Sequence, residues 1–310
     1  MGRRGATRHH RWAWRAGLAG ACALLLLAWL SQVSRPGRRV EGCLEGCASL
    51  EERKPGPLRY LSFNMLHEFP RFTHLEARLA LIADGFERVD ADIICLQEVP
   101  WTSGTGSAAR WLAERTGMNY AYLRANGNRF AILFEEGEAL LSRFPLREPS
   151  HTELLPRAGA FEHRVALAAT AETPWGDLRV ICTHLTNGDQ TLNQAQFRSL
   201  SALSDALAPP VVVSGDLNAQ PHELDIGQMG WVDAYRAVHP DEDGLTCCVE
   251  ALTAAPDEPL EERIDYVFLR PGPGAQRVAS SRIVFDRPAA TADGWLWASD
   301  HLGLLVMLAP

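Results

Sequence analysis

Lysine is almost absent from this chain of 310 residues, because Lys54 is the only lysine among 30 basic residues. No lysine-rich stretch is therefore present to bind a polyphosphate head group or a DNA duplex. Eight of the basic residues lie in the first 39 positions, which leaves 22 basic against 38 acidic residues and a net charge of −16 for the remainder. An acidic domain repels a polyanion, so tight binding of long nucleic acid is not favoured unless a local groove or a bound metal reverses the potential.

Cysteine spacing of the zinc-binding kind is also missing. The chain has seven cysteines, but they do not form two CxxC pairs and no histidine stands nearby. Cys95 and Cys182 lie in apolar runs and are expected to be buried small hydrophobic residues. Cys43 and Cys47 could pair in an oxidising compartment, and one residue of the adjacent pair Cys247-Cys248 could bridge elsewhere.

A long hydrophobic run is lacking as well. The longest one, Ala16 to Leu30, is shorter than the ~20 residues that span a bilayer. Five arginines precede it, and a basic segment before a short apolar run is the layout of a secretory signal. No small-x-small cleavage site follows, so residues 1–39 are expected to be either a signal peptide or an uncleaved signal anchor. The protein is then exported, and either secreted or anchored to the membrane.

Neither an internal repeat nor a low-complexity block divides the rest of the chain. Residues 40–57 are rich in Gly, Pro and Glu and predict a linker, and residues 58–310 predict one domain. Apolar residues at helical spacing predict helices at 75–89, 108–115 and 191–207. Short apolar runs predict strands at 58–64, 92–97, 120–124, 139–142, 164–171, 178–183, 211–214, 264–269, 282–285 and 302–308. Many short strands with a few helices favour an α/β fold of two packed sheets with the helices outside.

Several predicted strands end in a polar side chain of the kind that binds a hard cation. Asn64 ends the strand at 58–64, and Glu98 ends the segment Cys95-Leu96-Gln97-Glu98 after the next apolar run. Mg²⁺ prefers oxygen ligands and keeps several waters, so one or two carboxylates suffice. Glu98 is the expected direct ligand with Asn64 beside it, and Asp300 could also face the metal. Taken alone, each would more often be a turn or surface residue.

The segment Gly215-Asp216-Leu217-Asn218 follows an uninterrupted apolar strand at 211–213. In an extended segment alternate side chains point the same way, so Asp216 and Asn218 are expected to face together. Asp216 could hold or deprotonate an attacking water, and the Asn218 amide could donate to a phosphate oxygen. His184, at the end of another strand, could donate to the charge that develops on phosphate.

His301 needs a carboxylate to fix its tautomer and raise its basicity. Asp265 can supply this carboxylate across the sheet, although a salt bridge to Arg263 is a competing interpretation. Together, these side chains are what a protein needs to hold a divalent cation and activate water beside a phosphate. The sequence therefore predicts a metal-dependent phosphoesterase.

These motifs resemble the endonuclease/exonuclease/phosphatase superfamily, which includes deoxyribonuclease I, apurinic endonucleases, neutral sphingomyelinases and inositol-polyphosphate phosphatases. The resemblance extends from about Leu58 to Leu308 and includes residues 137–145, which are similar to the family's central strand. It implies a four-layer α/β sandwich of two mixed β-sheets with helices outside. It also implies Mg²⁺ dependence, with Mn²⁺ or Ca²⁺ as alternatives, and in-line attack of water on a phosphoester.

The resemblance also implies a role for each matching residue. Asn64, Glu98 and Asp300 would serve the metal, and His184 and Asn218 the phosphate. The nucleophile would be handled by Asp216, His301 and Asp265, and which of them takes the proton stays open. Apurinic endonucleases carry an acid two residues after the Asn, where this chain has Leu66, so DNA repair is less favoured.

Tryptophans beside the motifs bear on the substrate. Trp295 and Trp297 precede Ser299-Asp300-His301 and could rest in a lipid interface, stack on a base or pack inside the domain. With expected export and an acidic domain, we expect a phosphodiesterase acting on phospholipid head groups, similar to a sphingomyelinase. A secreted nuclease is the alternative, and a catalytically inactive binding scaffold is a further one. No feature indicates a protein partner.

Overall fold

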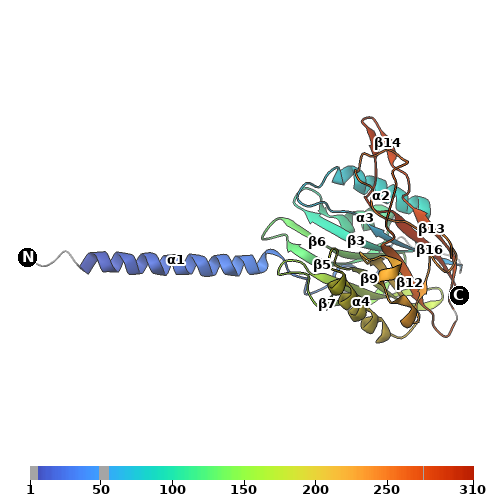
Figure 1. Ribbon diagram of the computed structural model, residues 1–310, viewed down its shortest axis with the longest axis horizontal. Helices are drawn as coiled ribbons and strands as arrows, with labels where there is room; N and C mark the ends of the chain where they lie inside the picture. The colour runs from blue at the N-terminus through green and yellow to red at the C-terminus, as the bar shows by residue number, and fades with distance from the viewer. Residues whose placement is uncertain (1–5, 49–55, 275) are drawn as a thin grey trace, which may run out of the picture.

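Two β-sheets packed face to face form the body of the protein, and helices cover their outer faces (Figure 1). This computed structural model describes residues 6–48, 56–274 and 276–310. The first sheet has the order β1-β5-β6-β3-β2-β16-β13 with β4 paired to β3, and the second has the order β11-β12-β10-β9-β8-β7. Both sheets mix parallel and antiparallel pairs. The predicted α/β four-layer sandwich is confirmed.

The first sheet combines strands from the two ends of the chain. Its strands are β1 (Glu41–Cys43), β2 (Leu58–Asn64), β3 (Ile93–Thr102), β4 (Gly106–Ser107), β5 (Asn119–Asn128), β6 (Phe134–Ser142), β13 (Arg277–Val284) and β16 (Gly303–Ala309). The helices α2 (Leu75–Val89) and α3 (Ala108–Thr116) cover its outer face. In α2 the residues Leu79, Ile82 and Phe86 recur at helical spacing and are buried there, as the sequence predicted.

The second sheet is built from the middle of the chain. Its strands are β7 (Leu146–Leu154), β8 (Arg164–Thr173), β9 (Gly176–His184), β10 (Val211–Asp216), β11 (Val232–Asp233) and β12 (Asp265–Arg270). Helix α4 (Gln190–Asp205) covers its outer face. Two short 3₁₀ helices follow β10, at Pro221–Glu223 and Ile226–Gln228. A separate hairpin, β14 (Ala289–Thr291) and β15 (Gly294–Leu296), belongs to neither large sheet. Strand β7 was not predicted. Apart from its end residues Leu146 and Leu154 it is half-buried or exposed, so it lacks an apolar pattern.

Side chains between the sheets hold the two layers in register. Tyr60 of β2 and Ser214 of β10 are buried there, and their hydroxyl oxygens lie 2.7 Å apart in a hydrogen bond across the layer. Cys95 of β3 and Cys182 of β9 are fully buried as expected, but they also form a disulfide. The expectation that they are only small hydrophobic residues was therefore wrong, because the two side chains face each other between the sheets.

The other cysteine pairs lie outside this layer. Cys43 and Cys47 form the expected disulfide beside β1. Cys247 and Cys248 pair with each other, so the expectation that one of them bridges elsewhere was wrong. Strand β1 pairs with β5, so part of the predicted linker at 40–57 belongs to a sheet edge. Residues 49–55 of that predicted linker lie outside the described residues.

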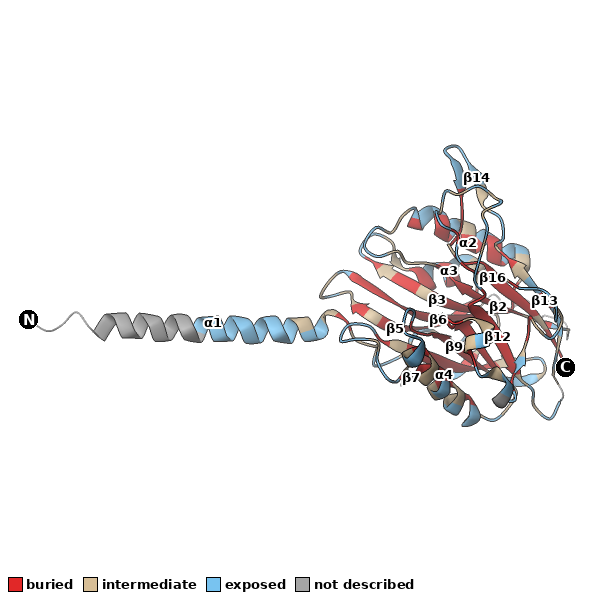
Figure 2. Ribbon diagram, viewed as in Figure 1, coloured by how far each residue is buried: buried red, intermediate tan, exposed pale blue. Residues whose placement is uncertain are grey.

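A single helix, α1 (Ala6–Val33), projects from the body (Figure 1). It contains the apolar run of the predicted signal segment. Figure 2 shows its described side chains to be almost all exposed, including Leu24 at 68% and Leu25 at 70%. In the parts of the chain that the structure describes, no helix is long and apolar enough to cross a membrane.

Candidate active site

The predicted site residues meet at one end of the two sheets. Strand β2 runs parallel to β3, and β9 runs parallel to β10, so their carboxyl ends lie at the same end of each sheet. Asn64 ends β2, His184 ends β9 and Asp216 ends β10. Asp265 begins the antiparallel strand β12 directly opposite Asp216. The strand pattern thus brings together residues that are up to 200 positions apart in the sequence.

Asn64 connects the two sheets within the site. Its side chain is fully buried, and Nδ2 donates to Oε1 of Glu98 at 3.2 Å and to Oδ2 of Asp216 at 3.0 Å. Its Oδ1 accepts a hydrogen bond from the backbone N–H of Leu66 at 3.0 Å. One amide therefore fixes the distance between a carboxylate of the first sheet and a carboxylate of the second.

Glu98 lies at an irregularity in β3, where the pairing with β6 shifts register between Leu96 and Val99. Its φ of 55° is in the left-handed region, which turns the side chain out of the regular alternation. Oε2 accepts from the backbone N–H of His67 at 3.1 Å. Burial alone would raise the pKa of Glu98, but the charges of His67 and His301 and the hydrogen bonds from His67 and Asn64 bring that pKa below its ordinary value.

Asp300 completes the carboxylates predicted to serve a metal. Burial raises its pKa, His301 opposes this, and the nearby charge of Glu98 raises the pKa again. Its Oδ1 accepts from the Ser299 hydroxyl at 3.2 Å. Glu98 and Asp300 are half-buried, and two carboxylates are a hard-oxygen donor set that fits a divalent cation such as Mg²⁺, with Asn64 holding Glu98 in place through Nδ2.

Asp216 is the most connected carboxylate of the site. Oδ1 accepts from the backbone N–H of Asn218 at 2.8 Å, and Oδ2 lies 3.3 Å from Nε2 of His184 and 3.7 Å from Nε2 of His301. Burial raises the pKa of Asp216 to about 7, with His301 opposing this effect and Asp265 adding to it. Asp216 is thus held close to the point where it can exchange a proton at neutral pH.

Asn218 and His184 form the expected polar pair beside Asp216. Nδ2 of Asn218 lies 2.8 Å from Nε2 of His184 and donates to the Leu185 carbonyl oxygen at 3.0 Å. An amide nitrogen can only donate, so Nε2 of His184 accepts. Burial and the positive charge of Arg164 hold the pKa of His184 well below its ordinary value. The ring is therefore neutral, with its proton on Nδ1, which has no partner among the described residues.

His301 and Asp265 form the predicted dyad. Nδ1 of His301 lies 2.9 Å from Oδ2 of Asp265, and both side chains are buried. Arg263 instead contacts Asp233 at 2.6 Å, so the competing salt bridge to Asp265 does not form. Burial would lower the pKa of His301, but Asp265 and Asp216 raise it well above the ordinary value. His301 is thus a cation held between two carboxylates. Asp216, Asp265 and His301 also form a cluster whose ligand atoms lie within 4.8 Å of one another.

Sequence reasoning missed Arg78, which organises the loops around the predicted metal ligands. Its guanidinium is fully buried and donates to the carbonyl oxygens of Met65, Leu66, Thr73 and Ala298. These bonds connect the loop after Asn64 with the segment just before Asp300. The signal was present in the sequence, because Arg78 lies between Leu75 and Ile82 on the apolar face of the predicted helix.

A sequence profile of the endonuclease/exonuclease/phosphatase family matches residues 61–301, which span all eight predicted site residues. The chain belongs to this family. Family members are hydrolases that act on phosphoester bonds, and they generally use divalent metal ions. A search of curated proteins found no match.

Solved structures of the endonuclease/exonuclease/phosphatase family share the fold. A family protein from Beutenbergia cavernae is 24% identical with a TM-score of 0.61, covering 81% of this chain and 71% of its own. D. rerio TDP2 complexed with a single-strand DNA product is 16% identical with a TM-score of 0.66, covering 83% of this chain and 100% of its own. The Bacteroides thetaiotaomicron mannosyl-6-phosphatase Bt3783 is 17% identical with a TM-score of 0.63, covering 82% of this chain and 100% of its own.

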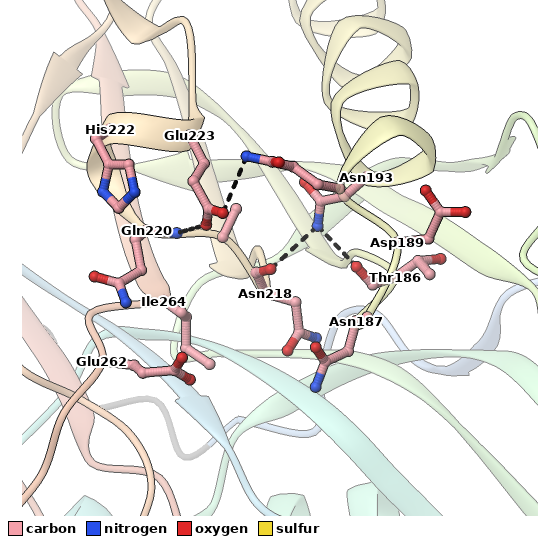
Figure 3. A pocket seen from close by; sticks show the side chains of 13 residues that line it. Thr186, Asn187, Asp189, Asn193, Asn218, Gln220, His222, Glu223, Glu262 and Ile264 are labelled. Atoms are coloured by element: carbon pink, nitrogen blue, oxygen red, sulfur yellow. Dashed lines mark hydrogen bonds between the residues drawn. The ribbon is translucent and has the colours of Figure 1, made fainter.

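Beside Asn218 a polar cavity of about 310 Å³ opens between α4 and the loop after β10 (Figure 3). Nδ2 of Asn193 donates to the carbonyl oxygens of Thr186 and Leu217 at 2.8 and 2.7 Å, which holds two of its walls together. Acids and amides such as Asn187, Gln220 and Glu262 line it, and no lysine or arginine does among the described residues. In this family member the space next to the phosphate residues is therefore acidic and hydrophilic.

The two tryptophans expected at a lipid interface differ in their exposure. Trp297 is buried at 3%, and its indole Nε1 donates to the Ala254 carbonyl oxygen at 3.0 Å. The prediction that Trp297 contacts a membrane was therefore wrong, since the side chain packs with Val249 and Leu302. Trp295 is 40% exposed on the β14–β15 hairpin, and its membrane contact stays a prediction.

Proposed function

We propose that this protein is a Mg²⁺-dependent phosphodiesterase that hydrolyses phospholipid head groups at a membrane surface outside the cytoplasm. The observation that carries the hydrolytic part is the meeting of Asp216, the His301–Asp265 dyad and the Asn64–Glu98 pair at one end of both sheets. A nucleophile site and a hard-cation site joined by one amide are what in-line attack of water on a phosphoester requires.

Glu98, Asn64 and Asp300 would hold the cation, which when bound supplies charge neutralisation for the phosphate oxygens. Asp216 orients the attacking water and takes its proton, since burial brings its pKa to about 7. His301, kept protonated by Asp265, donates to the charge that develops on phosphorus oxygens. Asn218 fixes the tautomer of neutral His184 through Nδ2, and the Nδ1–H of His184, which has no partner among the described residues, donates to a remaining oxygen.

The cavity beside Asn218 favours a head group over a nucleic acid chain. A polyanion is bound through several cationic side chains, and arginine and lysine do not line this cavity in the described chain. Asp189, Glu223 and Glu262 make it attractive to a positively charged or hydroxyl-rich leaving group. A nuclease is the second candidate, because the TDP2 structure that shares this fold contains a single-strand DNA product.

Export is supported by the N-terminal segment and by the cysteines. Six of the seven cysteines pair in three disulfides, and such bonds persist in oxidising compartments. The exposed apolar residues of α1 would attach the protein to the bilayer that carries its substrate.

The test is hydrolysis by the full chain, measured in parallel on sphingomyelin vesicles and on plasmid DNA. Each substrate is assayed with Mg²⁺ and with EDTA. The variant His301→Ala is assayed beside the parent protein, and His239→Ala, outside the site, is its matched control. We expect phosphocholine release that EDTA and His301→Ala abolish and His239→Ala leaves unchanged. DNA nicking with the same dependence and no lipid hydrolysis would replace the lipid proposal with the nuclease. Hydrolysis that survives EDTA would overturn the metal mechanism.

A further inference from the structure

A second cavity, of about 730 Å³, lies where α1 meets the domain, between its last turn and the loop that joins β7 to β8. The residues that matter for its chemistry are Arg35, Arg38, His151, Glu153, Arg157 and His163. They come from two segments more than 110 positions apart in the sequence. None of them belongs to the candidate active site.

Hydrogen bonds attach the end of α1 to the domain, so the walls of this cavity are fixed. The Ser34 hydroxyl donates to the Phe161 carbonyl oxygen at 2.6 Å and accepts from the Gly127 N–H at 3.1 Å. Nδ2 of Asn128 donates to the Gln32 carbonyl oxygen at 2.7 Å. Ser34 itself is buried. The cavity is thus a built feature of the fold and not a gap beside a loose helix.

The cavity is cationic in an otherwise acidic protein. Arg35, Arg38 and Arg157 stand against the single acid Glu153, a local charge of 3 − 1 = +2 with both histidines neutral. Glu153 is already shared by Arg157 at 2.6 Å and His163 at 2.7 Å. Arg38 has no hydrogen-bond or ion-pair partner within the described ranges 6–48, 56–274 and 276–310. The net charge beyond residue 39 is −16, so this concentration of arginine is a local exception.

His163 forms part of the wall of the cavity. Its side chain is only 3% exposed, and Nδ1 is engaged with Glu153. The other ring nitrogen, Nε2, has no partner among the described residues. His163 therefore holds Glu153 at the wall of the cavity and does not reach into it. The three guanidinium groups of the lining match a phosphate group.

Apolar side chains surround this cationic cavity. Leu155 and Phe161, in the loop that lines it, are 56% and 53% exposed. Phe130 and Leu133, in the β5–β6 hairpin that Asn128 joins to α1, are 90% and 59% exposed. The exposed leucines 24–27 lie in α1, the helix that ends at the cavity. Exposed apolar tips around a basic cavity at the base of an apolar helix are typical of a surface that meets a bilayer.

The same end of the molecule carries the rim of the active site. Thr102 of β3 pairs with Phe134 of β6, so the carboxyl end of β3, just beyond Glu98, lies at the β5–β6 hairpin. The Phe134 ring also lies 5.1 Å from the ring of His67, which contacts Glu98. A bilayer that contacts the hairpin tip is therefore close to the catalytic carboxylates.

We propose that the cavity at the base of α1 binds the phosphate of an anionic phospholipid and so fixes the domain on the bilayer with its active-site end toward the lipid. Arg35, Arg38 and Arg157 donate to the phosphate oxygens. Leu155, Phe161 and Phe130 enter the head-group layer around it. This lipid is an anchor and orienting ligand, separate from the substrate in the active site.

The experiment is native mass spectrometry of the full chain in neutral detergent micelles, titrated with dioctanoyl-phosphatidylglycerol, dioctanoyl-phosphatidylcholine or glycerol 3-phosphate. The variant Arg38→Gln removes a cavity arginine, and Arg39→Gln removes the same charge one residue outside the cavity. We expect one retained phosphatidylglycerol per chain, bound at least tenfold more tightly than phosphatidylcholine. In Arg38→Gln the affinity for phosphatidylglycerol should fall about fivefold, because one contributing arginine is lost. In Arg39→Gln the same affinity should fall less than twofold.

Three results would overturn this proposal. Equal losses in Arg38→Gln and Arg39→Gln would mean unspecific attraction of charge, and equal binding of the two lipids would remove the anionic preference. Glycerol 3-phosphate bound as tightly as phosphatidylglycerol would assign the cavity to a soluble phosphate. Both variants should hydrolyse bis(p-nitrophenyl) phosphate like the parent protein, which shows that each is folded and that any loss belongs to the lipid cavity and not to the catalytic site.

Discussion

Among single residues, the proposed catalytic chemistry depends on how burial separates the proton affinities of three neighbouring groups. Burial and Asp265 bring the pKa of Asp216 to about 7, whereas burial and Arg164 keep His184 neutral. Asp265 and Asp216 outweigh burial and keep His301 protonated. Residues of similar type thus acquire the distinct roles of base, neutral donor and cationic donor from their surroundings.

Replacing Asp265 tests this division of roles. Asp265→Asn keeps the size of the side chain but removes the charge that holds His301 protonated, so we expect kcat to fall about 100-fold. His301→Gln should cost at least as much. Because the two residues act as a unit, the double variant should be no worse than His301→Gln alone. Steady-state kinetics on bis(p-nitrophenyl) phosphate measures all three, and additive losses would contradict the dyad.

Arg78 is a positioning residue whose loss should affect both stability and metal binding. Arg78→Met leaves four buried carbonyl oxygens without a donor, which should lower the free energy of unfolding by about 3 kcal/mol. The same change loosens the loops that hold Asn64 and Asp300, so Mg²⁺ affinity should fall about tenfold. Urea unfolding and calorimetric Mg²⁺ titration measure the two effects. Arg71→Met, with its side chain 79% exposed in the same loop, should change neither.

At the element scale, the sequence was most informative where a strand or helix is buried on a regular pattern. The helix at 75–89 and the strand at 58–64 have the predicted bounds. The edge strands β1 and β7 were not predicted, because hydrogen bonds to a neighbouring strand, rather than apolar alternation, keep them in place. The meeting of the eight predicted site residues at one end of the sheets could be anticipated because each follows or precedes such an apolar strand. Arg78 and the disulfide between Cys95 and Cys182 could not, since both depend on which surfaces face each other after folding.

The disulfide between β3 and β9 should contribute strongly to stability. It closes a loop of 87 residues in the unfolded chain, for which the chain-entropy relation gives roughly 4.6 kcal/mol. Denaturant unfolding of the double variant Cys95→Ala/Cys182→Ala should therefore show a free energy of unfolding that is lower by this amount. The smaller side chains should add some further loss. Cys43→Ala/Cys47→Ala removes a disulfide separated by only four positions and should cost less. Similar losses in both would contradict the loop-length argument.

Glu135 of β6 should make the fold sensitive to acid. Burial would raise its pKa, but hydrogen bonds from Arg129 and Arg124 bring the pKa below the ordinary value. A carboxylate of this kind stabilises the fold above its unfolded pKa of about 4.3, and the stabilisation is lost as the pH falls through the lower folded pKa. Glu135→Gln should lower stability by about 2 kcal/mol at pH 7 and flatten the fall of Tm below pH ~4. The exposed Glu148→Gln, on neighbouring β7, should keep the parent profile.

For the molecule as a whole, the proposed function assigns catalysis to the acidic body and attachment to the apolar helix α1. A protein that begins at Ser34 keeps the contacts of Ser34 with Gly127 and Phe161 but lacks α1. It should hydrolyse bis(p-nitrophenyl) phosphate as fast as the full chain, within about twofold, because no site residue is touched. Its hydrolysis of vesicle substrates should fall at least tenfold, because the apolar surface of α1 is lost. Equal vesicle activity would show that α1 has no part in substrate access.

The order of the strands makes the protein a natural pair of complementary fragments, because β13 and β16 of the first sheet follow the whole second sheet along the chain. Residues up to Ser142 supply Asn64 and Glu98, and residues from Leu146 onward supply His184, Asp216 and Asp265. A cut in the short connection between β6 and β7 would leave two pieces that are each catalytically silent. Oxidation of Cys95 and Cys182 would then join them covalently as they reassemble. Recovered hydrolysis would report the meeting of the halves, so the enzyme could serve as a split reporter for oxidising compartments.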